Sequence, residues 1–289
     1  MRAVAIPPAW VDVWISPYEN GHLQAVGTDA AGRRQYLYHP DWRARRDQEK
    51  FDSMLEFAAA LPRLRSRVRR DLGRDDLGRD RVLGCAVRLL DLGFFRVGGE
   101  TYAEENGSYG LATLEKRHVE VDGAKLRFDY PAKSGQRRVL SLADPAARRV
   151  VVALKRRRGG GPQLLAYQER PGARWCNVRS EEINGYIKDR AGIDASAKDF
   201  RTWHANVLAA VQLAADGGER SRRSRERAIA ATVEYVAEQL GNTPAVCKAS
   251  YIDPRVFDRY RAGTTIAVPP RASLAAVERA VLGLLRPSG

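Results

Sequence analysis

Cysteine, histidine and long apolar runs are all scarce in this chain of 289 residues, and each shortage excludes a class of protein. The three cysteines, Cys85, Cys176 and Cys247, lie far apart and lack the spacing of zinc ligands. We therefore expect reduced thiols in a cytoplasmic protein without a zinc site. No apolar run approaches the roughly 18 residues of a membrane span. The apolar stretch that follows Met1 is also too short for a secretory signal.

Nucleotide-binding motifs are missing as well. Gly159-Gly-Gly161 is rich in glycine, but no Gly-Lys-Ser or Gly-Lys-Thr follows it, so it does not have the pattern of a phosphate-binding loop. The chain also shows no internal repeat. We therefore expect no phosphate-loop nucleotide site.

Acidic residues are clearly outnumbered. The chain has 49 Lys and Arg against 35 Asp and Glu, a formal net charge of +14. Such an excess is typical of proteins that bind a polyanion, most often DNA or RNA. A preference for arginine can also be a compositional habit, so charge alone leaves both interpretations open. The 44% hydrophobic fraction is enough for a core, and the length predicts one large or two medium domains.

The N-terminal segment predicts a small antiparallel sheet. Asn20-Gly21 is a hairpin signal between two alternating segments, and Ala31-Gly32 marks a second turn. The expected strands are residues 11–15, 22–26 and 33–38.

The third of these strands carries candidate DNA contacts. Alternation places Gln35 on one face and Tyr36 and Tyr38 on the other, and Arg33 and Arg34 precede them. The two tyrosines either contact DNA or pack on the core of the sheet.

Residues 41–72 have the periodicity of helices. We expect Pro62 to start a second, strongly basic helix, whose charged face either meets phosphate or is solvated. The polar segment Gly73–Gly78 is the candidate boundary between a β-rich domain of residues 1–77 and a second domain of residues 78–289.

The sequence predicts that the second domain is mainly α-helical with an inserted three-stranded antiparallel sheet, so the expected fold class is α+β. Strands are expected at 118–121, 125–130 and 137–142, with Lys133 at a hairpin tip. Residues 220–227 are expected to form a charged linker. Helices are expected at 81–95, 145–157, 180–191, 196–215, 224–240, 254–261 and 273–285, with a short one before Tyr251.

The stretch from Gly241 to Tyr251 has strong local signals. Gly241 is a helix C-cap signal, Thr243 can cap the next helix, and Pro244 suits its first position. Tyr251 then follows one short helix. It is either a buried tyrosine with a satisfied hydroxyl or a functional group.

Five polar residues together match the needs of a metal-free attack on a phosphodiester. These are two planar guanidinium forks, a mobile ammonium, an amide donor and a phenol: Arg96, Arg201, Lys133, Asn242 and Tyr251. His118 and His204 are more consistent with structural or DNA-contact roles.

At these residues the chain resembles the bacterial, poxvirus-type DNA topoisomerases of type IB over essentially its whole length. The resemblance is carried by Phe95-Arg96-Val-Gly, Glu105-Asn-Gly-Ser-Tyr-Gly-Leu-Ala-Thr-Leu, Lys133, Lys198-Asp-Phe-Arg201-Thr-Trp-His-Ala and Gly241-Asn-Thr-Pro…Ser-Tyr251, and the Arg33-Arg-Gln-Tyr-Leu-Tyr38 strand is similar to the family's DNA-clamping strand. Other members have a histidine where this chain has Asn242, an amide that can donate a hydrogen bond but cannot titrate.

The resemblance implies a function and a fold. Tyr251 would attack DNA to give a 3′-phosphotyrosine, the duplex would swivel, and the 5′-hydroxyl would attack back without ATP or metal. It further implies a tyrosine-recombinase-like catalytic domain in a C-shaped clamp, a monomer that holds double-stranded DNA and works at the nucleoid, and DNA contacts by Tyr102 and Lys198.

Two alternatives remain open at this point. A tyrosine recombinase has a similar catalytic domain, but it expects His-x-x-Arg where this chain has Lys198-Asp-Phe-Arg201. The other alternative is a basic DNA-binding protein without catalytic activity. Such a protein would not need chemically suitable side chains at all five of the candidate catalytic positions.

Overall fold

The computed structural model describes residues 5–100, 107–217, 221–267, 269 and 271–286. These residues form a mixed helix and sheet fold that divides into two compact units, Met1–Ser53 and Met54–Gly289. The division falls within one long helix, whereas the sequence pattern places a boundary near residue 77.

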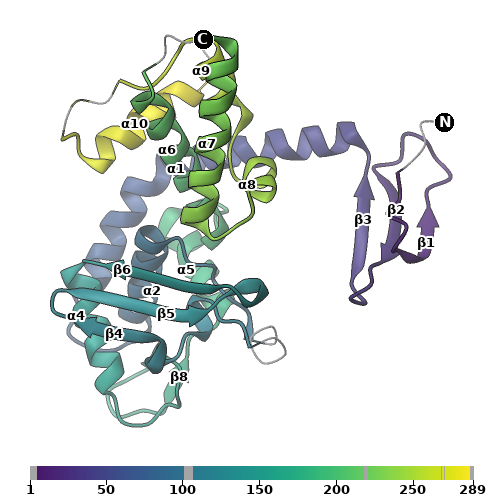
Figure 1. Ribbon diagram of the computed structural model, residues 1–289. Coiled ribbons are helices and arrows are strands. Elements are labelled where there is room, and N and C mark those ends of the chain that lie inside the picture. Colours follow the sequence, from purple (N-terminus) through teal and green to yellow (C-terminus); the bar gives the residue numbers. More distant parts are fainter. Residues whose placement is uncertain (1–4, 101–106, 218–220, 268, 270, 287–289) are drawn as a thin grey trace. The chain divides into compact units, whose positions relative to one another are not determined.

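The first unit contains the predicted antiparallel sheet (Figure 1), in the order β1-β2-β3. Its strands are β1 (Val11–Ile15), β2 (Leu23–Thr28) and β3 (Arg34–Tyr38). Tyr36 faces Val26 across the ladder. The side chains of Tyr36 and Tyr38 are 50% and 39% exposed, and their rings stack with centroids 6.4 Å apart. They therefore lie on the exposed face of the sheet and not in its core.

Helix α1 runs unbroken from Pro40 to Leu72, so the expected break at Pro62 is wrong. Proline removes one backbone N–H and normally kinks a helix interior. Here the apolar period continues across it, and Phe57, Leu61 and Leu64 are all at most 1% exposed. Burial on both sides of Pro62 outweighs the local penalty.

The second unit holds the inserted sheet and the helices that carry the candidate site. Figure 1 shows the sheet beside α2 and α4, with α6, α7, α9 and α10 gathered at the other end of the unit. The sheet comprises β4 (Val119–Asp122), β5 (Lys125–Pro131) and β6 (Arg137–Leu142), in antiparallel order as predicted. The helices are α2 (Arg79–Gly93), α4 (Pro145–Arg156), α5 (Ser180–Ala191), α6 (Ala197–Ala215), α7 (Arg222–Leu240), α8 (Pro244–Ser250), α9 (Pro254–Arg261) and α10 (Leu274–Leu285).

Two local expectations need correction. A short hairpin, β7 (Ala166–Gln168) with β8 (Trp175–Asn177), interrupts the region expected to be only helical. Residues 222–227 form the first turns of α7 and not a linker. Ser221 accepts a hydrogen bond from Ser224 N there, so the helix starts before its apolar stripe does.

An aromatic cluster forms the centre of the second unit. Trp203, Phe200 and Phe57 are each 1% exposed, and the last two meet edge to face with centroids 4.9 Å apart. Because Phe200 and Trp203 flank Arg201 on α6, this packing fixes the helix that presents Arg201. In the part of the chain that the structure describes, no helix is long and apolar enough to cross a membrane.

Candidate active site

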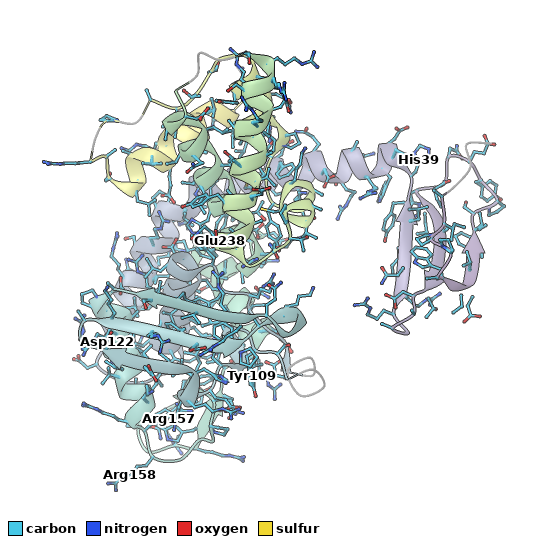
Figure 2. The ribbon with its side chains drawn as sticks, viewed as in Figure 1. His39, Tyr109, Asp122, Arg157, Arg158 and Glu238 are labelled. Carbon is cyan, nitrogen blue, oxygen red and sulfur yellow. The ribbon has the colours of Figure 1, made fainter. Side chains whose placement is uncertain are left out.

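Three arginines, from α6, from β6 and from the segment after α2, converge on the C-terminal end of α7. The last carbonyls of a helix have no partner within the helix, and they carry the negative end of its dipole. Glu238, labelled in Figure 2, lies in this last turn. The pairs are Arg138 Nη2 with Gln239 O at 2.6 Å, Arg201 Nη2 with Leu240 O at 2.9 Å, and Arg96 Nη2 with Gly241 O at 2.8 Å. Three consecutive carbonyls thus each hold one guanidinium, and positive charge is concentrated at one point.

Glycine packing fixes the backbone that presents Arg96. Its carbonyl accepts a hydrogen bond from Leu111 N at 2.8 Å. A Cβ on Gly110 would lie 2.4 Å from the Cα of Gly98, so neither position tolerates a side chain. Gly98 also has a φ of +81°, which L-residues rarely adopt. The two glycines therefore allow the close backbone contact that holds the segment Arg96–Gly98 in place.

Arg201 is almost completely buried, with 3% of its surface exposed. Besides Leu240 O, its guanidinium donates to the carbonyl of Phe94. Phe94 caps α2 in the left-handed region, with φ 53°, and this turns its carbonyl toward α6. Arg201 is thereby held by two backbone carbonyls from elements far apart in the sequence.

Asn242 lies directly after the α7 cap, where Gly241 has a φ of 62°. Its Oδ1 accepts a hydrogen bond from Arg96. Its Nδ2 is buried without a partner among the described residues. An unpaired buried donor is costly unless a ligand completes it. The free N–H is therefore suited to an anionic oxygen.

Local caps and one buried amide place Tyr251. Thr243 caps α8 through Val246 N, and Tyr251 is the residue that ends this helix, as predicted. Asn206, which is fully buried, donates from Nδ2 to Tyr251 O at 2.9 Å and accepts from Asp253 N at 2.8 Å. The local sequence carries no signal for this role of Asn206, because its partner lies in a segment 45 residues away.

The environment of Tyr251 favours its ionised form. Burial by itself raises the pKa of the phenol, but the positive charge and hydrogen bonding of Arg201, with the charges of Arg96 and Lys198, outweigh it and lower the pKa below 10.0. The Arg201 guanidinium carbon lies 5.3 Å from the centre of the tyrosine ring. Burial and the nearby charge of Arg201 also lower the pKa of Arg96. The structure thus brings Arg96, Arg201, Asn242 and Tyr251 together.

Lys133 is placed differently from these four residues. It is exposed in a short 3-10 turn (Lys133–Gly135) that connects β5 and β6. It has no hydrogen-bond or ion-pair partner among the described residues. The predicted position at a hairpin tip is confirmed, and the ammonium is free to reach a ligand.

The residues predicted to contact DNA differ in their surroundings. Lys198 is exposed near Tyr251. On β3, Gln35 donates to Asp29 Oδ2 at 2.9 Å, and Arg33 also contacts this carboxylate. Arg34, Tyr36 and Tyr38 are exposed, whereas Tyr102 lies outside the described residues.

The side chains of the two histidines are buried and packed against their neighbours. His118 is 6% exposed, its Nδ1 accepts from Glu115 N, and burial lowers its pKa. His204 is 5% exposed and packs against Phe94. Over the described ranges, no group of three or more metal-ligating side chains could hold a metal ion.

Comparison with known proteins identifies the family. Residues 39–265 match the family described as eukaryotic DNA topoisomerase I, catalytic core. The chain belongs to the type IB DNA topoisomerases. Residues 1–29 match the N-terminal domain of bacterial DNA topoisomerase IB, which agrees with the bacterial type expected from the sequence motifs.

Individual type IB topoisomerases align along most of the chain. The DNA topoisomerase 1B of Acanthamoeba polyphaga mimivirus is 30% identical over 265 residues, which are 90% of this chain and 79% of the viral protein. The DNA topoisomerase 1B of vaccinia virus (strain Copenhagen) is 23% identical and covers 89% of this chain and 80% of its own length. Membership of this family makes the chain a DNA-acting isomerase of type IB.

Replacement of Asn206 by leucine tests the placement of Tyr251. The variant leaves the Tyr251 carbonyl and the Asp253 N–H without partners, so we expect a loss of about 2 kcal/mol or more in the free energy of unfolding. With Tyr251 as the nucleophile that the sequence motifs predict, we also expect DNA cleavage to slow by up to about 10²-fold, because small misplacements of a reacting group are costly. Urea denaturation and single-turnover cleavage measure the two effects.

Val211→Ala is the matched control, since Val211 is on the same helix and 40% exposed. It should change neither quantity appreciably. A folded Asn206→Leu protein that cleaves DNA at the normal rate would contradict the positioning role.

Proposed function

We propose that the chain relaxes supercoiled duplex DNA through a transient 3′-phosphotyrosyl link at Tyr251, without ATP or a metal ion. The observation that carries the proposal is the convergence of two guanidiniums beside a phenol with a lowered pKa, with an unpaired amide N–H on the residue that Arg96 contacts. These groups are complementary to a phosphodiester that gains negative charge as it is attacked.

The nucleophile needs help to react at neutral pH. A phenol with a pKa near 10 is ionised in only about one molecule in 10³ at pH 7. The charges of Arg201, Arg96 and Lys198 lower the pKa of Tyr251 and so increase this fraction. The Tyr251 oxygen then forms a bond to phosphorus as the bond to the 5′-oxygen breaks.

We propose distinct roles for the remaining groups. Arg96 and Arg201 bind the non-bridging oxygens, which they can do in a bidentate way. Asn242 donates its free N–H to the same phosphate. Lys133 gives a proton to the departing 5′-oxygen, and an exposed lysine on a turn can approach a bound strand without moving the core. Resealing reverses these steps and releases Tyr251.

DNA binding is proposed to use both units. The exposed face of β3, with Arg34, Tyr36 and Tyr38, supplies groups that can stack or hydrogen-bond in a groove, and Gln35, Arg33 and Tyr102 complete this set by resemblance. Lys198 is proposed to contact DNA beside Tyr251. The family resemblance supports a monomer that encloses the duplex as a C-shaped clamp, with a tyrosine-recombinase-like catalytic domain, and that works at the nucleoid.

Plasmid relaxation in the presence of EDTA and without ATP tests the proposed function. We expect negatively supercoiled plasmid to become a ladder of topoisomers. Binding without relaxation would contradict the proposal and favour a recombinase or a passive DNA-binding protein, and a paired-site strand-exchange assay would separate these two.

Replacement of Asn242 tests its role as a donor. We expect Asn242→Ala to slow cleavage by about 10²-fold, the typical cost of losing one donor to a developing oxyanion. We expect Asn242→His to restore activity and to add a titration at about pH 6.5 to the pH–rate profile, because histidine titrates there and asparagine does not. Single-turnover cleavage across this pH range measures both effects, and full activity in Asn242→Ala would contradict the role.

A further inference from the structure

The third arginine at the end of α7 comes from the β5–β6 hairpin and not from the set expected by resemblance. Arg138 is the second residue of β6. Its Nη2 donates to Gln239 O at 2.6 Å, and its Nη1 lies 3.5 Å from Glu238 O. Within the described ranges, these are the hydrogen bonds that join the β5–β6 hairpin to α7. Arg138 therefore ties the strand pair that carries Lys133 to the helix that leads to Asn242 and Tyr251.

The hairpin is packed at the Tyr130–Arg138 pair, and backbone hydrogen bonds continue beyond it, from Tyr109 N to Pro131 O at 2.8 Å and from Ala132 N to Gln136 O at 2.7 Å. Tyr130, the cross-strand partner of Arg138, is 4% exposed and stacks on Phe95 with centroids 6.1 Å apart. Burial raises the pKa of Tyr130 to about 12, against the charges of Arg138, Arg201 and Arg96. Beyond the next pair, Pro131 with Arg137, the turn holds Lys133, which is exposed and has no partner among the described residues. Arg138 thus links a packed part of this hairpin to α7, five residues from Lys133.

Arg138 shares the end of α7 with Arg96 and Arg201, but its hydrogen-bond partners differ from theirs. The charges that lower the pKa of Tyr251 most are those of Arg201, Arg96 and Lys198. Both contacts of Arg138 are to carbonyls before Gly241, and Arg96 bridges onward to Asn242. Its contacts fit an anchor for the hairpin better than a group that stabilises the attacking oxygen.

We infer that Arg138 is a positioning residue for proton transfer to the departing 5′-oxygen: it anchors the β5–β6 hairpin on the end of α7 and so holds Lys133 in reach of the bond that breaks. This inference rests on the proposed function, in which Lys133 is the general acid. In that step the P–O5′ bond breaks, its electron pair stays on the 5′-oxygen, and Lys133 supplies the proton.

A sulfur-substituted DNA substrate separates this role from a structural one. When sulfur replaces the 5′-bridging oxygen at the cleavage site, the leaving group is a thiolate, whose conjugate acid has a pKa of about 8.5. Such a group leaves without a proton, so any defect in proton delivery should disappear. Single-turnover cleavage is measured on oxygen and sulfur duplexes of one sequence that the wild-type protein cleaves.

We expect Arg138→Ala to cleave the oxygen duplex about 10- to 10²-fold more slowly than the wild-type protein. On the sulfur duplex it should come within a few-fold of the wild-type rate. Equal slowing on both duplexes would overturn the inference and assign Arg138 to the phosphate or the nucleophile. Arg138→Gln, which keeps a hydrogen-bond donor, provides the same comparison if the alanine variant does not fold.

Two further variants complete the test. Arg137→Ala is the matched control, because Arg137 is the adjacent residue and pairs with Asp129 at 2.6 Å on the sheet. It should cleave both duplexes at close to the wild-type rates.

The variant Lys133→Ala tests the general acid itself. It should cleave the oxygen duplex slowly and the sulfur duplex at close to the wild-type rate. If the sulfur duplex restores the cleavage rate of Lys133→Ala but not that of Arg138→Ala, Arg138 does not position Lys133, while Lys133 keeps its role as general acid. If the sulfur duplex restores the rate of neither variant, Lys133 is not the general acid, and the inference about Arg138 fails with it.

Discussion

Replacement of Tyr251 by phenylalanine is expected to abolish DNA cleavage and relaxation while DNA binding persists. The change removes one oxygen and keeps the ring that lies 5.3 Å from the Arg201 guanidinium carbon. The backbone of residue 251 keeps its bond to the buried Asn206. The fold should therefore survive, and only the nucleophile is lost. Plasmid relaxation and equilibrium binding to a short duplex measure the two properties separately.

Tyr235→Phe is the matched control for this prediction. Tyr235 lies on α7 and is 39% exposed, so loss of its hydroxyl should leave relaxation unchanged. Relaxation by a homogeneous Tyr251→Phe protein would show that another group is the nucleophile.

Replacement of Arg201 by alanine should give the second largest loss. We expect cleavage to slow by about 10²–10³-fold, because a buried donor to the developing charge is removed. The pKa of Tyr251 should rise, since Arg201 is the largest of the influences that lower it. The part of the pH–rate profile that rises with ionisation of the phenol should therefore move to higher pH.

Arg201→Lys separates charge from geometry. Lysine keeps a positive charge but cannot hold two oxygens with a planar fork. Compared with Arg201→Ala, we expect Arg201→Lys to show a smaller shift of the pH–rate profile but almost the same loss of rate. Single-turnover rates from neutral to alkaline pH measure both quantities. A variant that lost rate without any shift in the profile would contradict the influence of Arg201 on the phenol.

The Arg201 variants also need a stability control. Arg201 is buried and bonded to the carbonyls of Phe94 and Leu240, so its removal leaves two buried acceptors unpaired. We expect a lower unfolding temperature for Arg201→Ala, and the cleavage assay must be run well below it. Lys188→Ala, a change in an exposed ion pair with Asp194, should alter neither stability nor cleavage.

Local sequence signals predicted much of the segment that ends at Tyr251. Gly241 adopts the positive φ expected of a C-cap, Thr243 caps α8, and Pro244 is its first residue. These features depend on single residues and their immediate neighbours, so they can be predicted from the sequence. The turn at Lys133 could be predicted for the same reason.

Tertiary packing decided what the sequence could not predict. The helix continues through Pro62 because Phe57, Leu61 and Leu64 are buried on both sides of it. Asn206 and Arg138 were not singled out, because their partners are backbone groups of segments 45 and 101 residues away. A carbonyl has no sequence signature, and three arginines that share one helix end can be found only in the folded chain.

The most direct measurement is the chemical identity of the covalent intermediate. A duplex designed to trap the cleaved complex is incubated with the protein in EDTA, the complex is digested with protease, and the nucleotide-bearing peptide is sequenced by mass spectrometry. We predict a single adduct, a 3′-phosphate ester on the Tyr251 oxygen. An adduct on any other residue, or DNA relaxation without an adduct, would contradict the assignment of Tyr251 as the nucleophile.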